Sequence, residues 1–274
     1  MKVSKTTRIA AAVLMLASTA VAQAEPVSDW YFTVTMTWTD WNFTDGGGLQ
    51  ANIPVDRSYI TWGASENGGM DASYHAYAPD RSRSGLYFFA TRNSQGNPAT
   101  GFAKTDETTA TNMLVHYNNA ILSSFKTLTD AKFSVSVQVR ERDSSDAMIT
   151  LVDPSQKFNV WFLETLNQGA NQGDIFATDF ADITGTFDYN GYTYSYTFGD
   201  IGNTLNPLGS DCARVGAPAS CNGFVTPENN DTILQFGLKI TNVTPAVPEP
   251  ETYAMLLAGL AVVGSVARRK ARRS

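Results

Sequence analysis

The chain has 274 residues, of which 43% are hydrophobic and 17% are charged, and its formal net charge at pH 7 is -6. Positive side chains gather at the two ends, so the long middle section is strongly acidic, which argues against nucleic acid or anionic lipid as a partner. The sequence has no Gly-x-Ser-x-Gly elbow, phosphate loop or zinc-protease motif, so nothing in it indicates an enzyme of those classes.

Residues 1–24 have the layout of a secretory signal peptide. A positively charged start precedes an uncharged apolar run at 9–17, and Ala22 and Ala24 form a small-x-small site. The apolar run is shorter than the roughly 20 residues that a membrane-spanning helix needs. We therefore predict export, with cleavage of the signal peptide after Ala24.

Hydrophobic and polar side chains alternate along many segments of residues 25–240. Clear examples are the segments 30–38, 133–139, 192–198 and 234–240. A period of two indicates strands with one buried face, and Asn190-Gly191 between two aromatic runs predicts a hairpin. We predict an all-β domain over 25–240, a single antiparallel β-sandwich of jelly-roll type.

Aromatic and threonine side chains suggest two binding roles for this domain. Aromatic platforms bind sugars, which makes extracellular polysaccharide a candidate partner, although core and rim packing is the more common role of such side chains. The tryptophans are Trp30, Trp38, Trp41, Trp62 and Trp161. A flat threonine ladder could bind ice, but the exposed face of one strand explains it as well. The ladder consists of Thr33, Thr35, Thr37 and Thr39.

His116, Asn118 and Asn119 form the sharpest polar cluster of the sequence. They indicate either a ligand or cation site at a strand end or a hydrogen-bonded turn, where Asn is favoured. We favour the turn, because no second histidine lies nearby in the sequence, and we keep His116 and Asn118 as candidate ligand residues.

Acidic loops could hold calcium, but none has the spacing of a known calcium loop. These loops are 40–45, 143–146 and 179–182. We therefore predict no metal-ligand set and no cofactor, with calcium as the one candidate ion.

Glu141 and Glu164 each follow a predicted strand. Glycosidases use two catalytic carboxyl groups that lie about 5 to 10 Å apart. Nothing in the sequence brings these two together, so we interpret them as solvated strand ends. We predict no catalytic residue and no enzyme, and a jelly-roll glycosidase ranks behind a carbohydrate-binding module as an alternative.

Cys212 and Cys221 are the two cysteines of the chain. An even count in an oxidising compartment predicts one disulfide. It would close a short loop and stabilise the fold by roughly 2–3 kcal/mol.

The end of the chain has three parts, after a short stalk that we place at 241–246. Pro248-Glu249-Pro250 comes first, and an uncharged stretch over 253–267 follows. Basic residues close the chain: Arg268, Arg269, Lys270, Arg272 and Arg273. We predict a short transmembrane helix within an anchor over 247–274, whose basic end stays on the cytoplasmic side.

This order of triplet, apolar helix and basic end resembles the PEP-CTERM sorting signal. The resemblance implies handling by an exosortase, a membrane-embedded cysteine peptidase that cuts near the motif and releases or transfers the protein. A Pro-x-Pro segment is stiff and extended. We therefore expect Pro248, Glu249 and Pro250 to be recognition residues that do no chemistry themselves.

The middle of the chain resembles the THxN family, PEP-CTERM proteins related to the choice-of-anchor domains. The segments that carry the resemblance are 60–63, 116–119, 158–165 and 212–228. The family is named for Thr-His-x-Asn, and here Val115 replaces the threonine while His116 and Asn118 match. The resemblance implies an extracellular β domain and supplies no reaction.

These predictions together describe an exported structural protein. Its precursor is anchored in the inner membrane and is processed by an exosortase-type peptidase. We expect the processed protein at the cell surface or in the extracellular matrix.

Overall fold

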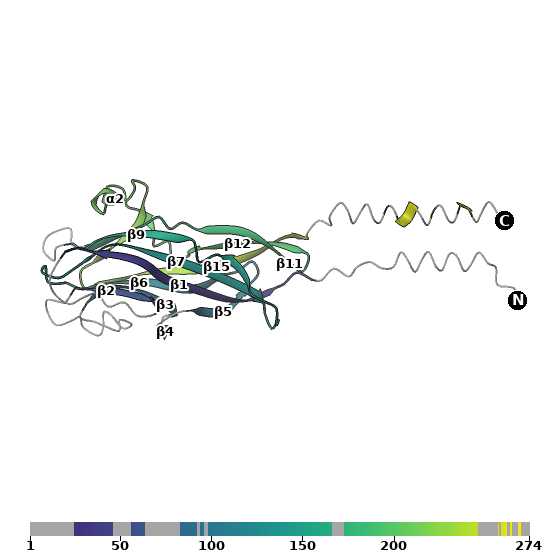
Figure 1. Ribbon diagram of the computed structural model, residues 1–274, viewed down its shortest axis with the longest axis horizontal. Coiled ribbons are helices and arrows are strands. Elements are labelled where there is room, and N and C mark those ends of the chain that lie inside the picture. Colours follow the sequence, from purple (N-terminus) through teal and green to yellow (C-terminus); the bar gives the residue numbers. More distant parts are fainter. Residues whose placement is uncertain are drawn as a thin grey trace. The chain divides into compact units, whose positions relative to one another are not determined.

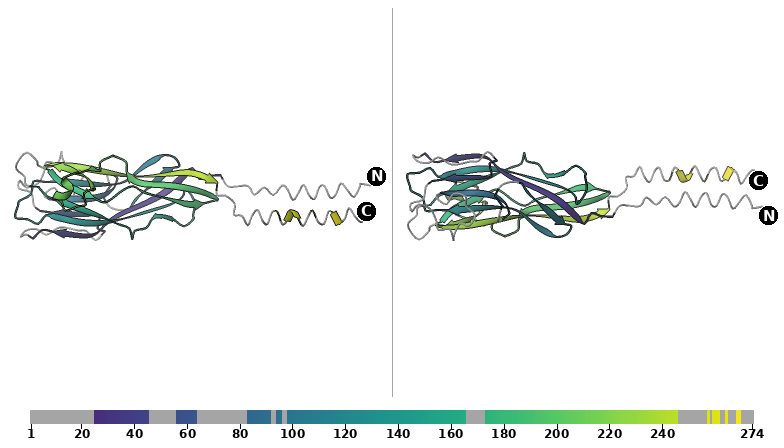
Figure 2. Two further views of the ribbon diagram at one scale, coloured as in Figure 1. Left: turned by 90° about the horizontal axis from the view of Figure 1, so that it is seen from above. Right: turned by 90° about the horizontal axis from the view of Figure 1, so that it is seen from below.

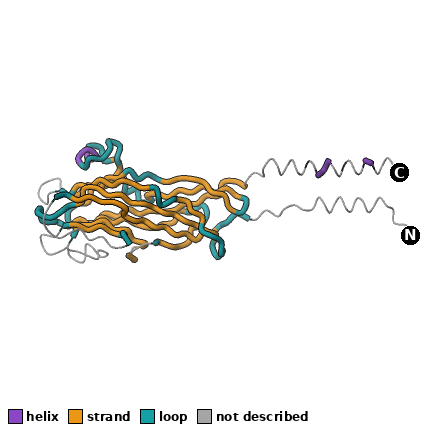
Figure 3. The backbone as a smooth tube through the Cα atoms, viewed as in Figure 1, coloured by secondary structure: helices purple, strands orange, loops and turns teal. Residues whose placement is uncertain are grey.

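The computed structural model describes residues 25–45, 56–63, 83–91, 94–95, 98–165 and 173–245, together with scattered residues between 257 and 269. Strands dominate this part of the chain (Figures 1 and 3). Several predicted features lie outside the described residues: Ala22, Ala24, Pro248, Glu249, Pro250, Lys270, Arg272 and Arg273.

Two antiparallel sheets form the body of the protein, and Figure 2 shows them as two layers. The first has the order β13 (Asn206–Pro207), β14 (Asn222–Pro227), β10 (Gly173–Thr178), β9 (Lys157–Leu163), β7 (Leu128–Glu141), β1 (Asp29–Phe43) and β5 (Ala99–Lys104), and β8 (Ile149–Val152) also pairs with β7. The second has the order β11 (Ile183–Tyr189), β12 (Tyr192–Asp200), β15 (Asn230–Pro245), β6 (Thr108–Asn118), β3 (Ser84–Thr91) and β2 (Tyr59–Trp62), and β4 (Ser94–Gln95) also pairs with β3. The predicted all-β sandwich is confirmed, and its jelly-roll connectivity stays a prediction.

The alternation along β1 produces the expected division between core and surface. Trp30, Phe32, Val34, Met36 and Trp38 are all buried, while the residues between them are half-buried. Trp38 stacks on Phe88 of the second sheet with a ring-centroid distance of 4.8 Å. One face of β1 therefore packs in the core between the two sheets, as the period of two predicts.

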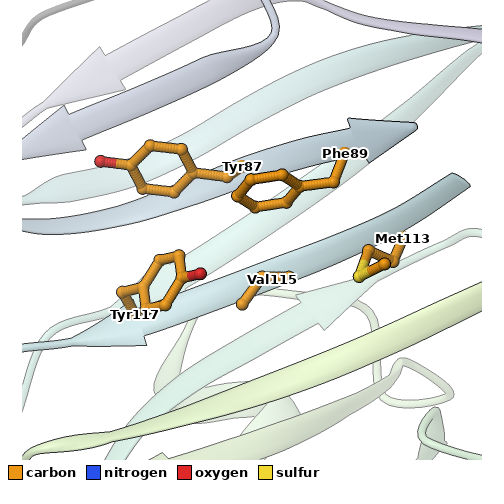
Figure 4. Packing of buried hydrophobic residues seen from close by; sticks show 5 residues of the cluster. All are labelled: Tyr87, Phe89, Met113, Val115 and Tyr117. Atoms are coloured by element: carbon orange, nitrogen blue, oxygen red, sulfur yellow. The ribbon is translucent and has the colours of Figure 1, made fainter. Parts of the chain in front are cut away.

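Strands β3 and β6 are buried on both faces over most of their length. Their sequences therefore do not alternate between hydrophobic and polar residues as those of β1 do. Phe88 of β3 and His116 of β6 contact aromatic rings of the first sheet. Since successive side chains alternate between faces, the neighbouring residues of both strands point the other way. These residues form a hydrophobic cluster on the other face of the second sheet, which Figure 4 shows: Tyr87, Phe89, Met113, Val115 and Tyr117. A strand buried on both faces reads as a continuous apolar run.

A disulfide joins Cys212 to Cys221, as the cysteine count predicts. Cys212 lies in the short helix α2 (Asp211–Arg214) and both cysteines are buried. Ala177 of β10 completes this small cluster, and the half-buried side chain of Trp161 packs against it. The disulfide therefore stabilises the irregular segment between β13 and β14, at the edge of the first sheet.

The chain divides into two compact units, of which Val27–Phe187 with Tyr194–Asn242 is the larger. The smaller unit comprises Met1–Pro26, Asp188–Thr193 and Val243–Ser274. Within it, Asn190 and Gly191 have φ values of 50° and 79°, as the predicted hairpin turn requires.

Strand β15 runs to Pro245, so most of the stalk that we placed at 241–246 is strand. Thr241, Val243 and Thr244 have high β propensity, which explains why the strand continues. Within the part of the chain that the structure describes, no helix has both the length and the apolar character of a membrane span. The transmembrane helix over 253–267 stays a prediction.

Candidate functional site

His116 lies inside strand β6, and this placement shows that the predicted turn is wrong. Its backbone is opposite Thr232 of β15 and Leu86 of β3, and its side chain is 0% exposed. The apolar residues before it favour a strand, and β6 ends only at Asn118. The imidazole is therefore a buried polar group, and a buried polar group must be satisfied by its surroundings.

Two threonines fix the tautomer of His116. The ring atom Nδ1 lies 2.8 Å from Thr226 Oγ1, and that hydroxyl donates its hydrogen to Thr232 Oγ1 over 2.9 Å. Because Thr226 has only one hydroxyl hydrogen, its oxygen must accept from Nδ1–H. The lone pair is therefore on Nε2, which faces Asp174 Oδ2 at 3.6 Å.

Aromatic rings surround the imidazole. Trp62 lies nearly parallel to it, with ring centroids 6.2 Å apart, and Phe162 meets it edge-on at 5.0 Å. The ring of Phe224 lies at 6.4 Å. These residues come from β2, β9 and β14, so His116 lies between the two sheets in a largely apolar enclosure.

Three carboxyl groups converge beside His116. Glu164 directly follows β9, Asp174 is the second residue of β10, and Glu228 follows β14. One oxygen from each lies within 4.8 Å of the others. Strand pairing explains the convergence, because β10 lies between β9 and β14 and brings the ends of all three strands together.

Two of these carboxyl groups are fixed through one oxygen each. Trp62 Nε1 donates to Glu164 Oε2 over 2.7 Å, and the backbone N–H of Thr165 donates to Asp174 Oδ1 over 2.9 Å. The other oxygens, Glu164 Oε1 and Asp174 Oδ2, are buried, and no hydrogen-bond donor among the described residues reaches them. Among the described residues, a proton shared between Glu164 and Asp174 would satisfy these oxygens, and so would a bound cation.

The surroundings raise the pKa values of both carboxyl groups. Burial raises the pKa of Glu164 well above its usual range, and repulsion from Asp174 adds to the effect. Burial raises the pKa of Asp174 to about 8, in spite of the Thr165 N–H that favours its ionised form. Without a cation, the two groups would therefore hold protons at a pH where exposed carboxyl groups are ionised.

The two asparagines next to His116 hold the end of β6. Asn118 Nδ2 donates to the backbone oxygen of Thr226 over 2.8 Å, which joins the two sheets. Asn119 exchanges bonds with Ser84 of β3, each 3.1 Å long. Both asparagines are buried, and the Oδ1 atom of Asn118 has no hydrogen-bond partner in the described part of the chain.

Glu141 and Glu164 lie at opposite ends of the sandwich, so they form no pair. Glu164 is, however, not the solvated strand end that we predicted, because its Oε1 atom is buried. Asp130, near the start of the long strand β7, is opposite Trp161, so Glu164 lies beyond the start of β7. Glu141 ends the same strand and is opposite Trp30. Glu164 instead faces Asp174, a pairing that the sequence analysis did not consider.

The tryptophans are mostly part of the core. Trp30, Trp38 and Trp62 are 0% exposed, and Trp41 and Trp161 are half-buried. The three buried rings cannot form a surface platform for sugars.

The threonine ladder is not repeated on the adjacent strand β7. Opposite Thr33, Thr35 and Thr37, β7 presents Gln138, Ser136 and Ser134. A flat ice-binding array needs the repeat, so the register gives this interpretation no support.

The predicted acidic loops use their carboxylates locally. Asp40 pairs with Lys132, and Asp179 accepts hydrogen bonds from the backbone and side chain of Asn159. Among the described residues, the group that could hold a metal is instead Glu164, Asp174 and Glu228.

The sequence analysis did not identify Asp174, Thr226 or Glu228 as site residues. Asp174 gives one recognisable signal, since it is a charged residue within Gly173–Thr178, a strand buried at all six positions. A carboxyl group in such a strand needs a partner. The partners lie on other strands, and only the fold brings them together.

Comparison with known proteins identifies the end of the chain. Residues 246–273 match the PEP-CTERM protein-sorting motif. No curated protein matches the chain. The match covers only the end of the chain, so the resemblance of the sandwich to the THxN family stays a prediction. The motif implies a substrate of exosortase sorting, which is made as a membrane-anchored precursor and exported to the cell surface or the extracellular space.

Proposed function

We propose that this chain is a non-enzymatic structural protein of the cell surface or extracellular matrix, which an exosortase releases from the inner membrane or transfers to the surface. The sorting motif at 246–273 carries the proposal, because it assigns the chain to a surface-delivery route. A β-sandwich immediately before the motif is the part that the route would deliver.

Two features of the sandwich support this role. The disulfide between Cys212 and Cys221 suits an oxidising compartment outside the cytoplasm. The carboxyl oxygens Glu164 Oε1 and Asp174 Oδ2 are buried, whereas a glycosidase needs its carboxyl groups open to a sugar. The disulfide thus supports a location outside the cytoplasm, and the buried carboxyl oxygens favour a structural module over a glycosidase.

Replacing Pro248, Glu249 and Pro250 with alanine in the full chain tests the sorting step. We expect the uncut precursor to accumulate in the membrane fraction, because the stiff recognition segment is lost. Mass spectrometry of the C-terminus and fractionation into membrane, surface and medium provide the measurement. The matched control replaces Pro218 and Ser220, which are exposed, and should be processed normally. Normal processing of the triple variant would contradict the proposal.

The structural role is tested with a glycan array probed with the processed protein. We expect no saturable binding, since the rings of Trp30, Trp38 and Trp62 are enclosed in the core. Saturable binding of one polysaccharide would replace the structural role with carbohydrate recognition, the alternative that the aromatic composition suggested.

A further inference from the structure

We propose that Glu164, Asp174 and Glu228, with His116 beside Asp174, form a binding site for one divalent cation of the oxygen-preferring class, Ca²⁺ or Mn²⁺. The site lies within the larger compact unit, with its three carboxylates at the ends of strands of the first sheet and His116 on the second. This inference is independent of the sorting function and assigns a role to the most polar part of the core.

The first argument is the distance between the ligand atoms. The three carboxylate oxygens lie within 4.8 Å of one another. Oxygen ligands lie about 2.3–2.6 Å from Ca²⁺, so ligands on opposite sides of the ion are up to about 5 Å apart. Mg²⁺, with ligands at about 2.0–2.1 Å, keeps its ligands closer and retains several waters. The spread of the group therefore suits the larger ion.

The second argument is the unsatisfied oxygen of Asp174. The residue is 0% exposed, no donor from the described residues reaches its Oδ2 atom, and one of its oxygens belongs to the group of three. Its other oxygen is held by the Thr165 N–H, which fixes the direction of the carboxylate. Asp174 is thus a buried side chain aimed at the point where a cation would lie.

The third argument is the orientation of His116. Because Nδ1–H is given to Thr226, the lone pair of Nε2 points toward Asp174. His116 is not one of the three residues whose oxygens lie within 4.8 Å of one another, so it lies beside the group, with Nε2 3.6 Å from Asp174 Oδ2. In this tautomer the imidazole is neutral and brings no positive charge to the carboxylates.

The fourth argument is charge. No Lys or Arg side chain of the described residues lies within ion-pair distance of Glu164 or Asp174, and the neighbour of Asp174 is His116, at 3.6 Å. Buried carboxylates without a countercharge are strongly destabilising. A divalent cation removes this penalty, and three carboxylate oxygens without a thiolate suit Ca²⁺ or Mn²⁺.

Thermal unfolding of the processed chain, stripped with EDTA and then titrated with CaCl₂ or MnCl₂ at pH 7, tests the site. We expect a hundredfold excess of the preferred ion over its dissociation constant to raise the midpoint by about 5–10 °C, because the ion binds only the folded state. The ion with the larger shift identifies the preferred cation. No shift with either ion at millimolar concentration would overturn the proposal.

Isosteric variants separate loss of the site from loss of the fold. Asp174→Asn and Glu164→Gln keep the shape of the side chains but remove a charged ligand, so both should lose the ion-induced shift. Their metal-free midpoints should be close to that of the stripped wild type, since neutral amides of the same shape replace carboxyl groups that hold protons when no cation is bound. Glu141→Gln is the matched control at the opposite end of β7 and should keep the full shift. An ion-induced shift that persists in Asp174→Asn would contradict the assignment.

Terbium luminescence provides a readout that needs no variant. Tb³⁺ occupies Ca²⁺ sites, and excited tryptophan transfers energy to it over short distances. Trp62 donates its hydrogen bond to Glu164, so its ring lies beside the site. We expect Tb³⁺ emission under tryptophan excitation that saturates at one ion per chain and is displaced by CaCl₂ or MnCl₂. Emission that neither salt displaces would count against the site.

Discussion

At the scale of single residues, the core of this sandwich contains more polar chemistry than its sequence suggests. His116, Thr226 and Thr232 form a hydrogen-bonded row that crosses from one sheet to the other and back. Glu164 and Asp174 lie at one end of this row, with raised pKa values. The effects of pH and of the threonine hydroxyl can both be predicted from this arrangement.

Thr226→Val should destabilise the protein, because valine has the same shape but can neither accept from His116 nor donate to Thr232. Leaving a buried polar group without its partner costs about 1–3 kcal/mol. Urea unfolding followed by circular dichroism measures the loss. Thr35→Val is the control: Thr35 is half-buried on β1 and should change the free energy of unfolding by less than about 0.5 kcal/mol. Equal losses in the two variants would refute the role of the row.

The metal-free protein should lose stability as the pH rises from about 4 to about 8. The folded-state pKa of Asp174 is raised to about 8 from a usual value of 3.8, so in this range the folded chain keeps a proton that the unfolded chain has lost. His116, Glu164 and Glu228 face the same carboxyl group, and Glu164 shifts in the same direction. Urea midpoints in EDTA at pH 5 and pH 8 provide the comparison. A higher midpoint at pH 8 would contradict this prediction, and Asp174→Asn should reduce the difference.

At the scale of elements, local sequence determined some strands and not others. The alternation in β1, β7, β12 and β15 was enough to predict them, since each has one buried face. Strand β10 is buried at every position and β6 at its last eight, so neither alternates throughout, and the sequence analysis did not recognise them. Both strands carry residues of the candidate site. The sequence therefore points to His116 and Glu164 but not to Asp174, whose strand β10 has no alternation.

The disulfide should account for a measurable share of the stability. Replacing Cys212 and Cys221 together with alanine opens a loop of sequence separation 9 and should cost about 2–3 kcal/mol. Guanidinium unfolding of the variant and of the native protein gives the difference. The native protein under reducing conditions is the control and should lose a similar amount. A double variant as stable as the native protein would show that the surrounding cluster alone holds the segment.

At the scale of the whole molecule, aromatic contacts join the two sheets. Trp38 of β1 stacks on Phe88 of β3, and Phe180, which follows β10, contacts Phe236 of β15 at 5.3 Å. The composition indicates that the chain has enough aromatic residues for a core of this kind, but it does not predict which rings contact one another. Those partners depend on strand order, and the sequence does not reveal it, because neighbouring strands come from distant segments.

Trp38→Ala should cost about 3–5 kcal/mol, because it removes a fully buried ring between the sheets. Trp41→Ala is the control on the same strand, and its half-buried ring should cost clearly less. Urea unfolding of both variants gives the comparison. A smaller loss for Trp38→Ala than for Trp41→Ala would place the main core elsewhere.

The strand order also governs when this domain can fold. The first strand, β1, lies in the interior of its sheet between β5 and β7, and the last, β15, lies in the interior of the other sheet between β12 and β6. A chain that crosses a membrane from its N-terminus delivers β1 first, yet β1 must wait for residues 99–104 and 128–141 before it can pair. The second sheet stays divided until β15 arrives, and pairings between such distant segments form slowly. Neither sheet can therefore be completed before the later strands are available, and an incomplete chain exposes the sheet interiors that the finished protein buries.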